Sequence, residues 1–447
     1  MPEAEALLQA ASRTVLVAAL RAVLEQARAR MRADVLQPPP SAATLLDLAA
    51  AVIAAGAAPV LRRAINATGI VLHTNLGRAP LARAALDAVA EAARGYSNLE
   101  FDLAEGVRGS RTQGIEPLLL ELTGAEAGLA VNNAAAAVLL ALSAIAGSGP
   151  GGGEVIVSRG ELVEIGGGFR IPDVIRQGGA RLIEVGTTNK TRIADYRDAI
   201  TPQTRMLLKV HQSSYRIVGF TAEVGIAELA GLARERDLVL MQDLGSGAML
   251  DLRRFGRPYE PTVRDALAAG ADLVAFSGDK LMGGPQAGIL VGRTHVVAPL
   301  RRHPLLRALR LDKMTLAALE ATLRLYRNPD EAVTEIPVLR MLGQSGSVLA
   351  ARAALLCELL GAVVVATTEP STGYAGGGTL PDSTIPSHAV SIHSSHVEAG
   401  ILAARLRAHR PAIIGRLASG RFLLDMLAVE DAEIPVMAAA IRKAAAS

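Results

Sequence analysis

Cysteine is almost missing from this chain of 447 residues, which contains only Cys357. A single cysteine excludes a disulfide within the chain and any zinc site made of several cysteines. Because Cys357 lies in the apolar run 355–359, it is predicted to be a small hydrophobic residue of the core. The sequence therefore fits a reducing compartment.

Tryptophan is absent and aromatic residues make up only 3% of the chain, although half of all residues are hydrophobic. A large core is therefore expected, built mainly from leucine, valine, isoleucine and alanine. Charge of one sign is also lacking, since 46 basic and 43 acidic side chains leave a formal net charge of +3. The overall charge therefore gives no argument for a nucleic-acid partner, although local basic patches remain open.

Long hydrophobic runs are lacking as well. The longest uncharged apolar stretches, 48–61 and 134–147, fall short of the roughly 18 residues expected of a membrane span. The N-terminus is acidic before any apolar run, which is wrong for a signal peptide. We expect a soluble, cytoplasmic protein without a membrane partner.

Residues 1–62 are alanine-rich and helical in pattern, with a break around 37–41 and Ser41 as the predicted cap of a second helix. Three arginines recur at spacings of seven and four residues, so they can share one helical face: Arg21, Arg28 and Arg32. On composition alone, this is a solvated helix surface.

Residues 63–312 alternate short apolar runs with segments of helix length, which is typical of a parallel sheet covered on both faces. The runs are Glu154–Ser158, Arg181–Val185, Met206–Val210, Leu238–Gln242, Leu273–Phe276 and Gly288–Val291. Ligands of such sheets bind beyond the carboxyl ends of the strands.

Residues 313–447 are predicted to hold a linking helix and a small α+β domain. The linking helix is expected at Lys313–Arg327. The predicted elements of the small domain are helices at Ser345–Leu360 and Val397–Ala408 and strands at Ala362–Thr367 and Ala389–His393.

Lysine is rare, with five residues in all, and one of them follows a predicted strand. Lys280 ends the run Ser277-Gly278-Asp279-Lys280 and precedes a glycine-rich segment that permits close backbone approach. A desolvated lysine amine loses its proton easily, as an imine-forming lysine must. The local pattern alone fits a surface lysine equally well.

An acid and a helix start complete a set of features that together fit pyridoxal phosphate. Asp243 follows the strand Leu238–Gln242, and an acid there can pair with a protonated pyridine nitrogen. Asn132 and Asn133 open an alanine-rich helix whose N-terminal amides can hold a phosphate, with Ser277 as a further donor. His211, at the end of another strand, is either a contact of the cofactor ring or phosphate or a core histidine.

Seven motifs in order make the chain similar to bacterial selenocysteine synthase, the L-seryl-tRNA(Sec) selenium transferase family. They are Ile65–Gly69, Leu72–Arg78, Ser97–Asp102, Ser158–Gly167, Glu184–Asn189, Ser277–Lys280 with its glycine tail, and His303–Arg310. The resemblance runs over most of the chain, including the N-terminal helical part.

The resemblance implies an α/β, fold-type-I (aspartate aminotransferase-like) pyridoxal 5'-phosphate enzyme, with Lys280 as the Schiff-base lysine and Asp243 as the pyridinium partner. It implies conversion of L-seryl-tRNA(Sec) to L-selenocysteinyl-tRNA(Sec), by loss of water and addition of selenium from selenophosphate to an aminoacrylyl group. An N-terminal domain that binds tRNA(Sec) and a homodecamer of five dimers are also implied.

The same resemblance assigns the pocket for the selenium donor to Arg78, Arg307 and Arg310, with Asp279 beside it. Arg307 and Arg310 are three residues apart, so we expect them on one helical face. Planar guanidinium groups suit a selenophosphate dianion well. A solvated basic face is the alternative for this pair.

One residue departs from the pattern: Leu427 stands two residues after Asp425, where an arginine is expected. The change puts the detail of the small-domain site in doubt. His393 and His396 have a spacing that can hold a metal ion, but we expect no metal there because no cysteine or acidic cluster is evident nearby.

Two other functions remain open from the sequence. One is a related pyridoxal phosphate lyase acting on a small amino acid or an amino-sugar acid, although about 60 N-terminal residues favour tRNA. The other is a non-catalytic RNA-binding protein, which the presence of both Lys280 and Asp243 disfavours.

Overall fold

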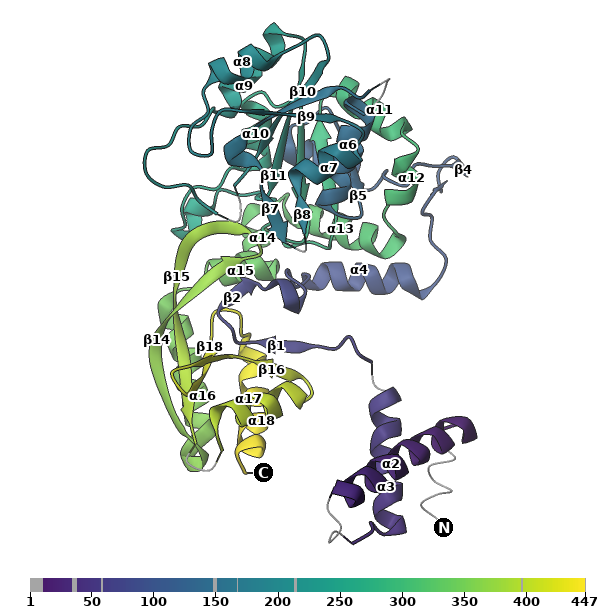
Figure 1. Ribbon diagram of the computed structural model, residues 1–447, viewed down its shortest axis with the longest axis vertical. Helices are drawn as coiled ribbons and strands as arrows, with labels where there is room; N and C mark the ends of the chain where they lie inside the picture. The colour runs from purple at the N-terminus through teal and green to yellow at the C-terminus, as the bar shows by residue number, and fades with distance from the viewer. Residues whose placement is uncertain are drawn as a thin grey trace. The chain divides into compact units, whose positions relative to one another are not determined.

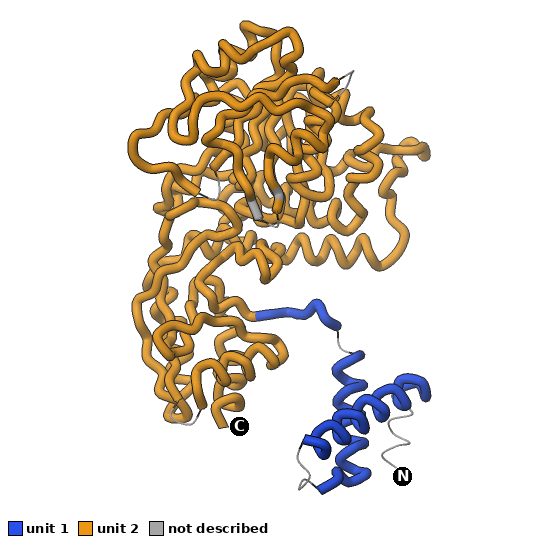
Figure 2. The backbone as a smooth tube through the Cα atoms, in the orientation of Figure 1, with its two compact units in different colours: residues 1–64 blue, residues 65–447 orange. Residues whose placement is uncertain are grey.

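A computed structural model describes residues 11–33, 38–57, 59–147, 151–166, 168–212, 215–394 and 397–446. The chain divides into two compact units, Met1–Ala64 and Ile65–Ser447, which Figure 2 shows in different colours. His396 lies outside the described residues, so the pairing of His393 with His396 is not tested.

The described residues of the first unit include the helices α2 (Arg13–Ala33) and α3 (Ala42–Ala57). The backbone N–H of Thr44 donates to Ser41 Oγ over 3.1 Å, which confirms the predicted cap of the second helix. Three small side chains form the shared core: Ala19, Val23 and Ala49. The three arginines that recur along α2 are all exposed: Arg21, Arg28 and Arg32.

The second unit is built on a seven-stranded sheet of order β5-β13-β12-β11-β10-β6-β9. The strands are β5 (Ala127–Val131), β6 (Glu154–Ser158), β9 (Arg181–Val185), β10 (Thr204–Val210), β11 (Val239–Gly245), β12 (Leu273–Ser277) and β13 (Gly288–Gly292). Pairing is parallel from β9 through β12, whereas β13 is antiparallel to both of its neighbours. All six predicted apolar runs lie in this sheet, and β5 is a seventh strand that was not predicted.

Both faces of the sheet are covered by helices, as Figure 1 shows. On β12, Leu273 and Ala275 pack toward α6 and α11, whereas Val274 and Phe276 pack toward α10 and α13. Burial on both sides explains why the strand sequences are continuous apolar runs. The covering helices are α5 (Glu116–Thr123), α6 (Ala134–Ile145), α7 (Ile171–Gln177), α8 (Ile193–Ala199), α9 (Ile226–Glu235), α10 (Val263–Ala268), α11 (Thr294–Arg302) and α13 (Lys313–Leu325).

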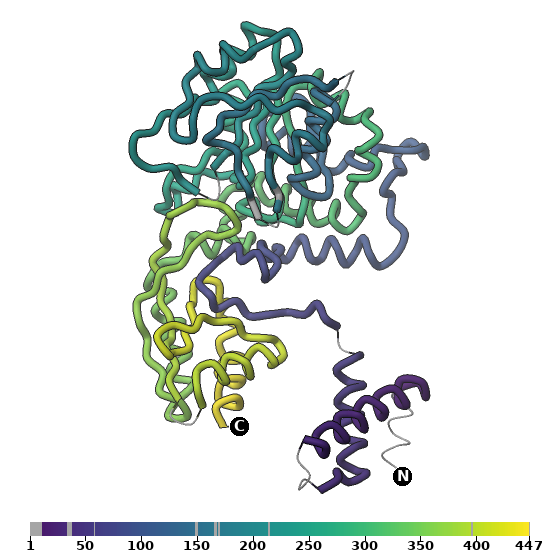
Figure 3. The backbone as a smooth tube through the Cα atoms, viewed as in Figure 1, coloured from purple at the N-terminus to yellow at the C-terminus, as the bar shows by residue number. Residues whose placement is uncertain are grey.

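The same unit contains a second sheet, of five strands in the order β17-β18-β15-β14-β2. Its strands are β2 (Ile70–Leu72), β14 (Val365–Gly376), β15 (Thr379–His393), β17 (Arg416–Ala418) and β18 (Arg421–Asp425). The early strand β2 runs parallel to β14 with Ile70 opposite Tyr374, and Figure 3 shows the two chain segments, distant in colour, side by side.

The predicted strands of the small domain need correction. Residues Gly361–Val363 form the 3-10 helix η4, so β14 starts later than predicted and extends to Gly376. The predicted strand at residues 389–393 is only the end of the 15-residue strand β15. The helices beside this sheet are α16 (Gly346–Leu360), α17 (Ala399–Ala408) and α18 (Ile434–Ala446).

Among the described residues, Gly346–Val363 is long and apolar enough to span a membrane by length and composition alone. In the structure, Leu349, Ala353 and Leu356 of this segment belong to the core that it shares with the small sheet and α18. Arg352, which is buried, pairs with Asp431 over 2.6 Å. One face of the segment therefore packs on this core, while Val348 and Leu355 on its other side are exposed.

Short elements connect these layers. They are β1 (Ala64–Asn66), η1 (Thr74–Leu76), α4 (Arg83–Arg94), β3 (Phe101–Asp102), β4 (Val107–Arg108), η2 (Arg159–Glu161), β7 (Glu164–Gly166), β8 (Phe169–Arg170), η3 (Leu252–Phe255), α12 (Leu305–Leu309), α14 (Pro329–Glu335), α15 (Pro337–Leu342), β16 (Ala412–Ile414) and η5 (Asp431–Glu433). The mostly parallel large sheet, the small α+β part and the helical N-terminus make up the fold-type-I arrangement that the sequence predicts.

Candidate active site

The carboxyl ends of three parallel strands bring the first site residues together. In the sheet register, Val210 of β10 lies opposite Asp243 of β11, and Asp243 lies opposite Ala275 of β12. His211 follows β10, and its backbone N–H donates to the Asp243 carbonyl over 2.9 Å. His211 and Asp243 are therefore neighbours, although 31 other residues separate them in the sequence.

Lys280 lies in a tight turn after β12, and the backbone of this turn is fixed by hydrogen bonds. The Gly283 N–H donates to the Lys280 carbonyl over 2.9 Å, and the Leu281 N–H donates to the Ser246 carbonyl over 3.0 Å. A Cβ at Gly278 would lie 2.6 Å from the Pro285 carbonyl oxygen, so only glycine fits there. These contacts tie the lysine turn to the segment that follows Asp243.

Lys280 and Asp243 are both buried and influence each other electrostatically. Burial lowers the pKa of the Lys280 amine, and the negative charge of Asp243 opposes that shift. Burial raises the pKa of Asp243 to about 6, while Lys280, His211 and the Gly245 backbone N–H act to lower it. The amine therefore loses its proton more readily than an exposed lysine.

Glu260 is a further member of this group that sequence reasoning missed. Its Oε1 lies 3.1 Å from His211 Nε2, and its side chain is buried. Its charge also acts on the Lys280 amine. No strand end or glycine motif marks this position; the only unusual feature nearby is the pair of prolines, Pro258 and Pro261.

The start of α6 lies at the same edge of the sheet. Asn133 is the N-cap of this helix, and its side chain accepts a hydrogen bond from the Ala136 N–H over 2.8 Å. A Cβ at Gly288, where β13 begins, would lie 1.9 Å from the Asn133 carbonyl oxygen, so the strand and the helix start touch here. Asn132 is exposed, and Ser277 is buried at the end of β12. Free N–H groups at such a helix start favour an anion.

Arg78 and Asp279 form an ion pair of 2.6 Å and line one cleft with the loop Gly284–Gln286. Arg78 has a positive φ of 61°, which is uncommon for a side chain larger than glycine. Asp279 precedes Lys280, and the charges of Arg78 and Asp279 both act on the lysine amine. The structure therefore brings two of the four predicted donor-pocket residues next to the lysine.

The other two predicted arginines are arranged differently. Arg307 lies in the short helix α12, but Arg310 follows that helix with an extended backbone and makes a β-bridge with Val131. The prediction that both share a helical face is therefore wrong, because strand-like pairing at Val131 ends the helix first. Among the described residues of one chain, neither arginine forms an ion pair with Asp279; Arg310 lies 3.7 Å from Glu100.

Leu427 occupies the core of the small domain. It is fully buried, and a Cβ at Gly373 would lie 2.4 Å from Leu427 Cδ2. Its backbone N–H donates to Asp425 Oδ1 over 3.0 Å. The position that departs from the expected arginine is thus a packing position in this chain.

Several buried polar atoms in segments that carry or contact the site residues have no partner among the described residues. They are Ser246 Oγ, Gln242 Oε1 and His73 Nδ1. Gln242 and Ser246 flank the Asp243 strand end, and the carbonyl of His73 accepts a hydrogen bond from the Arg78 N–H. Buried polar atoms normally have partners, so such a group fits a site built for a polar ligand. An amine of lowered pKa, a buried carboxylate and a helix start together fit the aldehyde, ring nitrogen and phosphate of pyridoxal phosphate.

Comparison with known proteins agrees with this geometry. A family model described as L-seryl-tRNA selenium transferase matches residues 64–430. The L-seryl-tRNA(Sec) selenium transferase of Geobacter sulfurreducens is 50% identical over 438 residues, covering 97% of this chain and 94% of the relative. The protein of the same name from Hyphomonas neptunium is 50% identical over 443 residues, covering 98% and 95%.

Among solved structures, a D-glucosaminate-6-phosphate ammonia-lyase is similar, with a TM-score of 0.60 and 25% identity over 86% of this chain and 96% of that one. The family match covers well over half of the chain, and the resemblance seen in the motifs is confirmed. This chain belongs to the L-seryl-tRNA selenium transferase family.

Proposed function

We propose that this protein converts L-seryl-tRNA(Sec) to L-selenocysteinyl-tRNA(Sec), with selenophosphate as the selenium donor. The observation that carries the proposal is the buried pair of Lys280 and Asp243 at one sheet edge, in a chain of this family. Lys280 contributes an amine of lowered pKa, and Asp243 contributes a carboxylate that burial leaves poorly solvated.

Pyridoxal 5'-phosphate, when bound, supplies an aldehyde that joins the seryl amino group and a ring that withdraws electrons from the serine Cα. Asp243 would hold the proton on the ring nitrogen. The N–H groups at the start of α6, with Asn132, Asn133 and Ser277, would hold the phosphate. His211 would contact the ring from the end of β10.

Lys280 has two tasks in this scheme. Its Nζ would hold the cofactor by its aldehyde carbon, and as a free amine it would take the proton from the serine Cα. A low amine pKa serves both tasks, because only the neutral amine is a nucleophile or a base. The serine β-hydroxyl would then leave as water with a proton that the protonated Lys280 amine can supply.

Selenophosphate would be held as an anion by Arg78, Arg307 and Arg310, with Asp279 setting the position of Arg78 through their ion pair. Arg307 is exposed and makes no ion pair or side-chain hydrogen bond with the described residues, which leaves its guanidinium available. Selenium would add to the β-carbon of the former seryl group while a proton returns to Cα, and water would cleave the Se–P bond to release phosphate.

The remaining parts of the proposal concern the roles of the domains, the oligomeric state and the cellular location. Residues 1–62 would form the tRNA-binding domain, which the exposed arginines of α2 support, with 63–312 as the cofactor-binding domain and 313–447 as the linker helix and small domain. A cytoplasmic homodecamer of five dimers fits the exposed apolar side chains around the β3–β4 hairpin: Tyr96, Phe101, Leu103 and Val107.

A second function deserves a direct comparison, since the similar solved structure is an ammonia-lyase of an amino-sugar acid. That likeness has 25% identity, against 50% for the selenium transferases. The lyase reading predicts turnover of a small free substrate, whereas the transferase reading predicts turnover only of serine attached to tRNA(Sec).

The test uses the purified full-length protein with cofactor, seryl-tRNA(Sec) and selenophosphate. We expect borohydride to fix the cofactor to Lys280 and Lys280→Ala to lose both this modification and turnover. Lys313→Ala is the matched control, because among the described residues the contact of Lys313 Nζ is a hydrogen bond to the exposed Gly95 carbonyl. Turnover retained by Lys280→Ala contradicts the scheme, and ammonia release from a free amino-sugar acid favours the lyase. A colourless protein that binds tRNA without turnover points to the non-catalytic reading.

A further inference from the structure

We propose that the cavity beside the end of β11 binds the adenosine at the 3' end of the seryl-tRNA, and that Gln242 recognises its base. The inference rests on the proposed function, because serine then reaches the protein as an ester of that adenosine. Every tRNA ends in the single strand CCA. The terminal nucleoside must therefore lie one ribose and one ester bond away from the serine that meets the cofactor.

The cavity adjoins the strand end that carries Asp243. Its volume is about 640 Å³, which is enough for a nucleoside, and Gln242 and His211 are among its lining residues. Gln242 precedes Asp243 in the chain, and the His211 backbone N–H donates to the Asp243 carbonyl over 2.9 Å. Successive side chains of a strand point to opposite faces, so Gln242 and Asp243 point to opposite sides of β11. A substrate that passes this strand end can have its serine on the Asp243 side and its nucleoside in the cavity.

Gln242 presents an unused hydrogen-bond acceptor. Its side chain is only 6% exposed, and its Oε1 has no hydrogen-bond partner among the described residues. Gln212, which lines the same cavity, is already engaged, because its Nε2 donates to the Gly160 carbonyl over 2.7 Å. A buried amide oxygen normally has a partner, so a ligand that donates a hydrogen bond fits beside Gln242. The amino group of adenine is such a donor, and glutamine pairs with adenine through both of its amide atoms.

The charges of the buried lining residues favour an uncharged ligand over a phosphate group. Lys209 Nζ lies 2.7 Å from Glu161 and 3.4 Å from Glu223. His211 Nε2 lies 3.1 Å from Glu260 Oε1. Both of these basic groups therefore already face a carboxylate. A carboxylate such as that of Glu260 can accept more than one hydrogen bond, and ribose hydroxyls are donors that acidic side chains bind in nucleotide sites.

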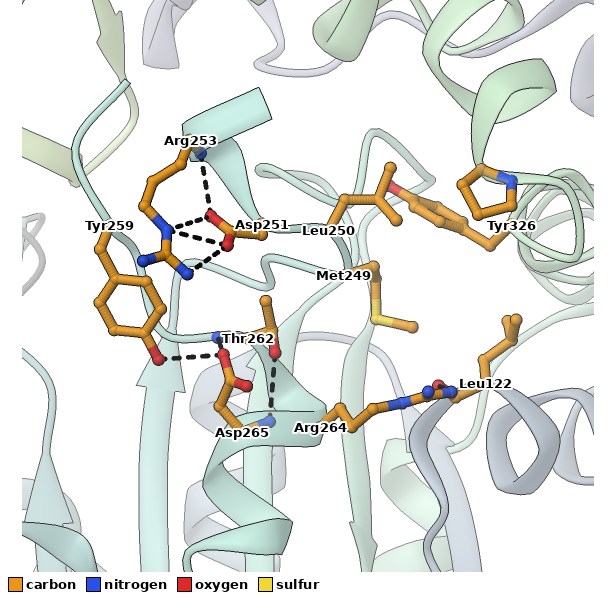
Figure 4. A pocket seen from close by; sticks show the side chains of 11 residues that line it. Leu122, Met249, Leu250, Asp251, Arg253, Tyr259, Thr262, Arg264, Asp265 and Tyr326 are labelled. Atoms are coloured by element: carbon orange, nitrogen blue, oxygen red, sulfur yellow. Dashed lines mark hydrogen bonds and ion pairs between the residues drawn. The ribbon is translucent and has the colours of Figure 1, made fainter. Parts of the chain in front are cut away.

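Two tyrosines of the lining are held in place by their hydroxyl groups. Tyr215 OH donates to the Gly160 carbonyl over 2.5 Å, and Tyr259 OH donates to Asp265 Oδ2 over 3.0 Å. Figure 4 shows the second contact from a neighbouring pocket, where the Arg253 guanidinium carbon lies 5.1 Å from the centre of the Tyr259 ring. Rings that are fixed in this way suit the stacking of a base.

The exposed edge of the cavity has the features of a contact with single-stranded RNA. Arg216 and Lys190 line it, and Lys190 Nζ lies 2.7 Å from the centre of the Phe220 ring. Phe220 is 82% exposed. Proteins hold single strands with aromatic rings on which bases stack and with basic side chains that follow the backbone. These residues suit the cytidines and phosphates that precede the terminal adenosine.

The test measures binding of two trinucleotides to the full-length protein loaded with cofactor. One is CpCpA, and the other ends in purine riboside, which is adenosine without the amino group. We expect wild type to bind CpCpA about tenfold more tightly, because one base-edge contact is lost in the second ligand. Gln242→Leu should bind both trinucleotides equally. Isothermal titration calorimetry measures the dissociation constants. Equal binding by wild type, or a preference that Gln242→Leu keeps, overturns the proposal.

Gln203→Leu is the matched control. Gln203 is exposed, precedes the opposite end of β10 from His211, and accepts at Oε1 from Thr201 Oγ1 over 3.0 Å. This variant should keep the preference for CpCpA, and its loss here would mean that the preference does not depend on the cavity.

If Gln242→Leu does not fold, photocrosslinking of wild type decides. A CpCpA that ends in 2-azidoadenosine should attach to a lining residue such as Tyr215 or Tyr259, as peptide mapping would identify. A crosslink at another site, or none, overturns the proposal. A protein that shows the Gln242-dependent preference but does not convert seryl-tRNA(Sec) counts against the proposed function alone. A protein that converts seryl-tRNA(Sec) without this preference counts against the present inference alone.

Discussion

Two of the buried aspartates, Asp425 and Asp243, have different surroundings. Asp425, in β18 of the small sheet, accepts hydrogen bonds from Ser371 Oγ over 2.6 Å and from Ser387 Oγ over 2.7 Å. Arg416 Nη2 lies 3.4 Å from the same carboxylate. Donors on neighbouring strands thus satisfy both carboxylate oxygens, and the negative charge ties β14, β15 and β18 together.

Asp243 is buried to a similar degree at the end of β11, but its carboxylate is held differently. The backbone N–H of Gly245 and the charges of Lys280 and His211 act to lower its pKa. No side-chain hydrogen bond to its carboxylate occurs within the part of the chain that the structure describes. A carboxylate with unused acceptor capacity can take a ligand, whereas one with its capacity filled stabilises the fold.

The largest expected effect is on turnover, and it tests whether the two buried aspartates have different roles. In Asp243→Asn, turnover should fall about 10³-fold, because the amide cannot hold a positive charge on the ring nitrogen. Asp425→Asn should keep turnover per folded molecule within a few-fold of wild type. Steady-state rates with seryl-tRNA(Sec), normalised to bound cofactor, measure both. Equal losses in the two variants would remove the functional distinction.

The second prediction concerns the contribution of Asp425 to the free energy of unfolding. Asp425→Ala should lower the free energy of unfolding by about 3 kcal/mol, because two serine hydroxyls and Arg416 then lose a buried partner. The value is at the low end for a buried pair, since Arg416 is 36% exposed. Urea unfolding of the cofactor-free protein measures it. A loss under 1 kcal/mol contradicts the structural role.

The third effect is the pH dependence that burial of Asp243 produces in the cofactor-free protein. Its pKa is about 6 when folded, against 3.8 for an ordinary aspartate, so the folded state binds the proton more tightly. Stability therefore falls as pH rises from 3.8 to 6, by up to about 3 kcal/mol, and stays lower above pH 6. Asp243→Asn should remove this loss and stabilise the apoprotein at pH 8 relative to wild type.

Thermal unfolding of the cofactor-free variants at pH 5 and pH 8 checks the sign. The Asn variant should gain on wild type mainly at the higher pH. Cofactor should reverse the order, because ligand binding stabilises only the form that binds it. A variant that is less stable than wild type at pH 8 without cofactor contradicts the assignment.

The surroundings of Asp243 could be predicted from the sequence better than those of Asp425, for a physical reason. Strands buried on both faces are continuous apolar runs, so the large sheet and the residues at its strand ends, including Asp243 and Lys280, could be located directly. The hairpin β14–β15 has many exposed and polar residues, with Pro370 and Pro386 inside its strands, so its length was missed.

Contacts between segments that are distant in the sequence could not be predicted from it either. Glu260 meets His211 only because a loop and a strand end converge, and no local pattern marks that contact. Arg310 was expected on a helical face, but pairing with Val131 gives it an extended backbone. Spacing rules describe residues of one element, and they fail where two elements meet.

The smallest expected effect comes from removing one neutral hydrogen-bond donor to the Asp425 carboxylate. Ser387→Ala takes one hydroxyl from Asp425 but leaves Ser371 and the Leu427 N–H in place. A hydrogen bond to a charged group contributes about 1.5 kcal/mol or somewhat more, so the loss should be roughly half of that for Asp425→Ala. Urea unfolding of Ser387→Ala, of Asp425→Ala and of the double variant gives the coupling between the two side chains. If Ser387 acts through Asp425, the double variant should lose no more than Asp425→Ala alone, whereas full additivity would mean that the hydroxyl stabilises the hairpin by another contact.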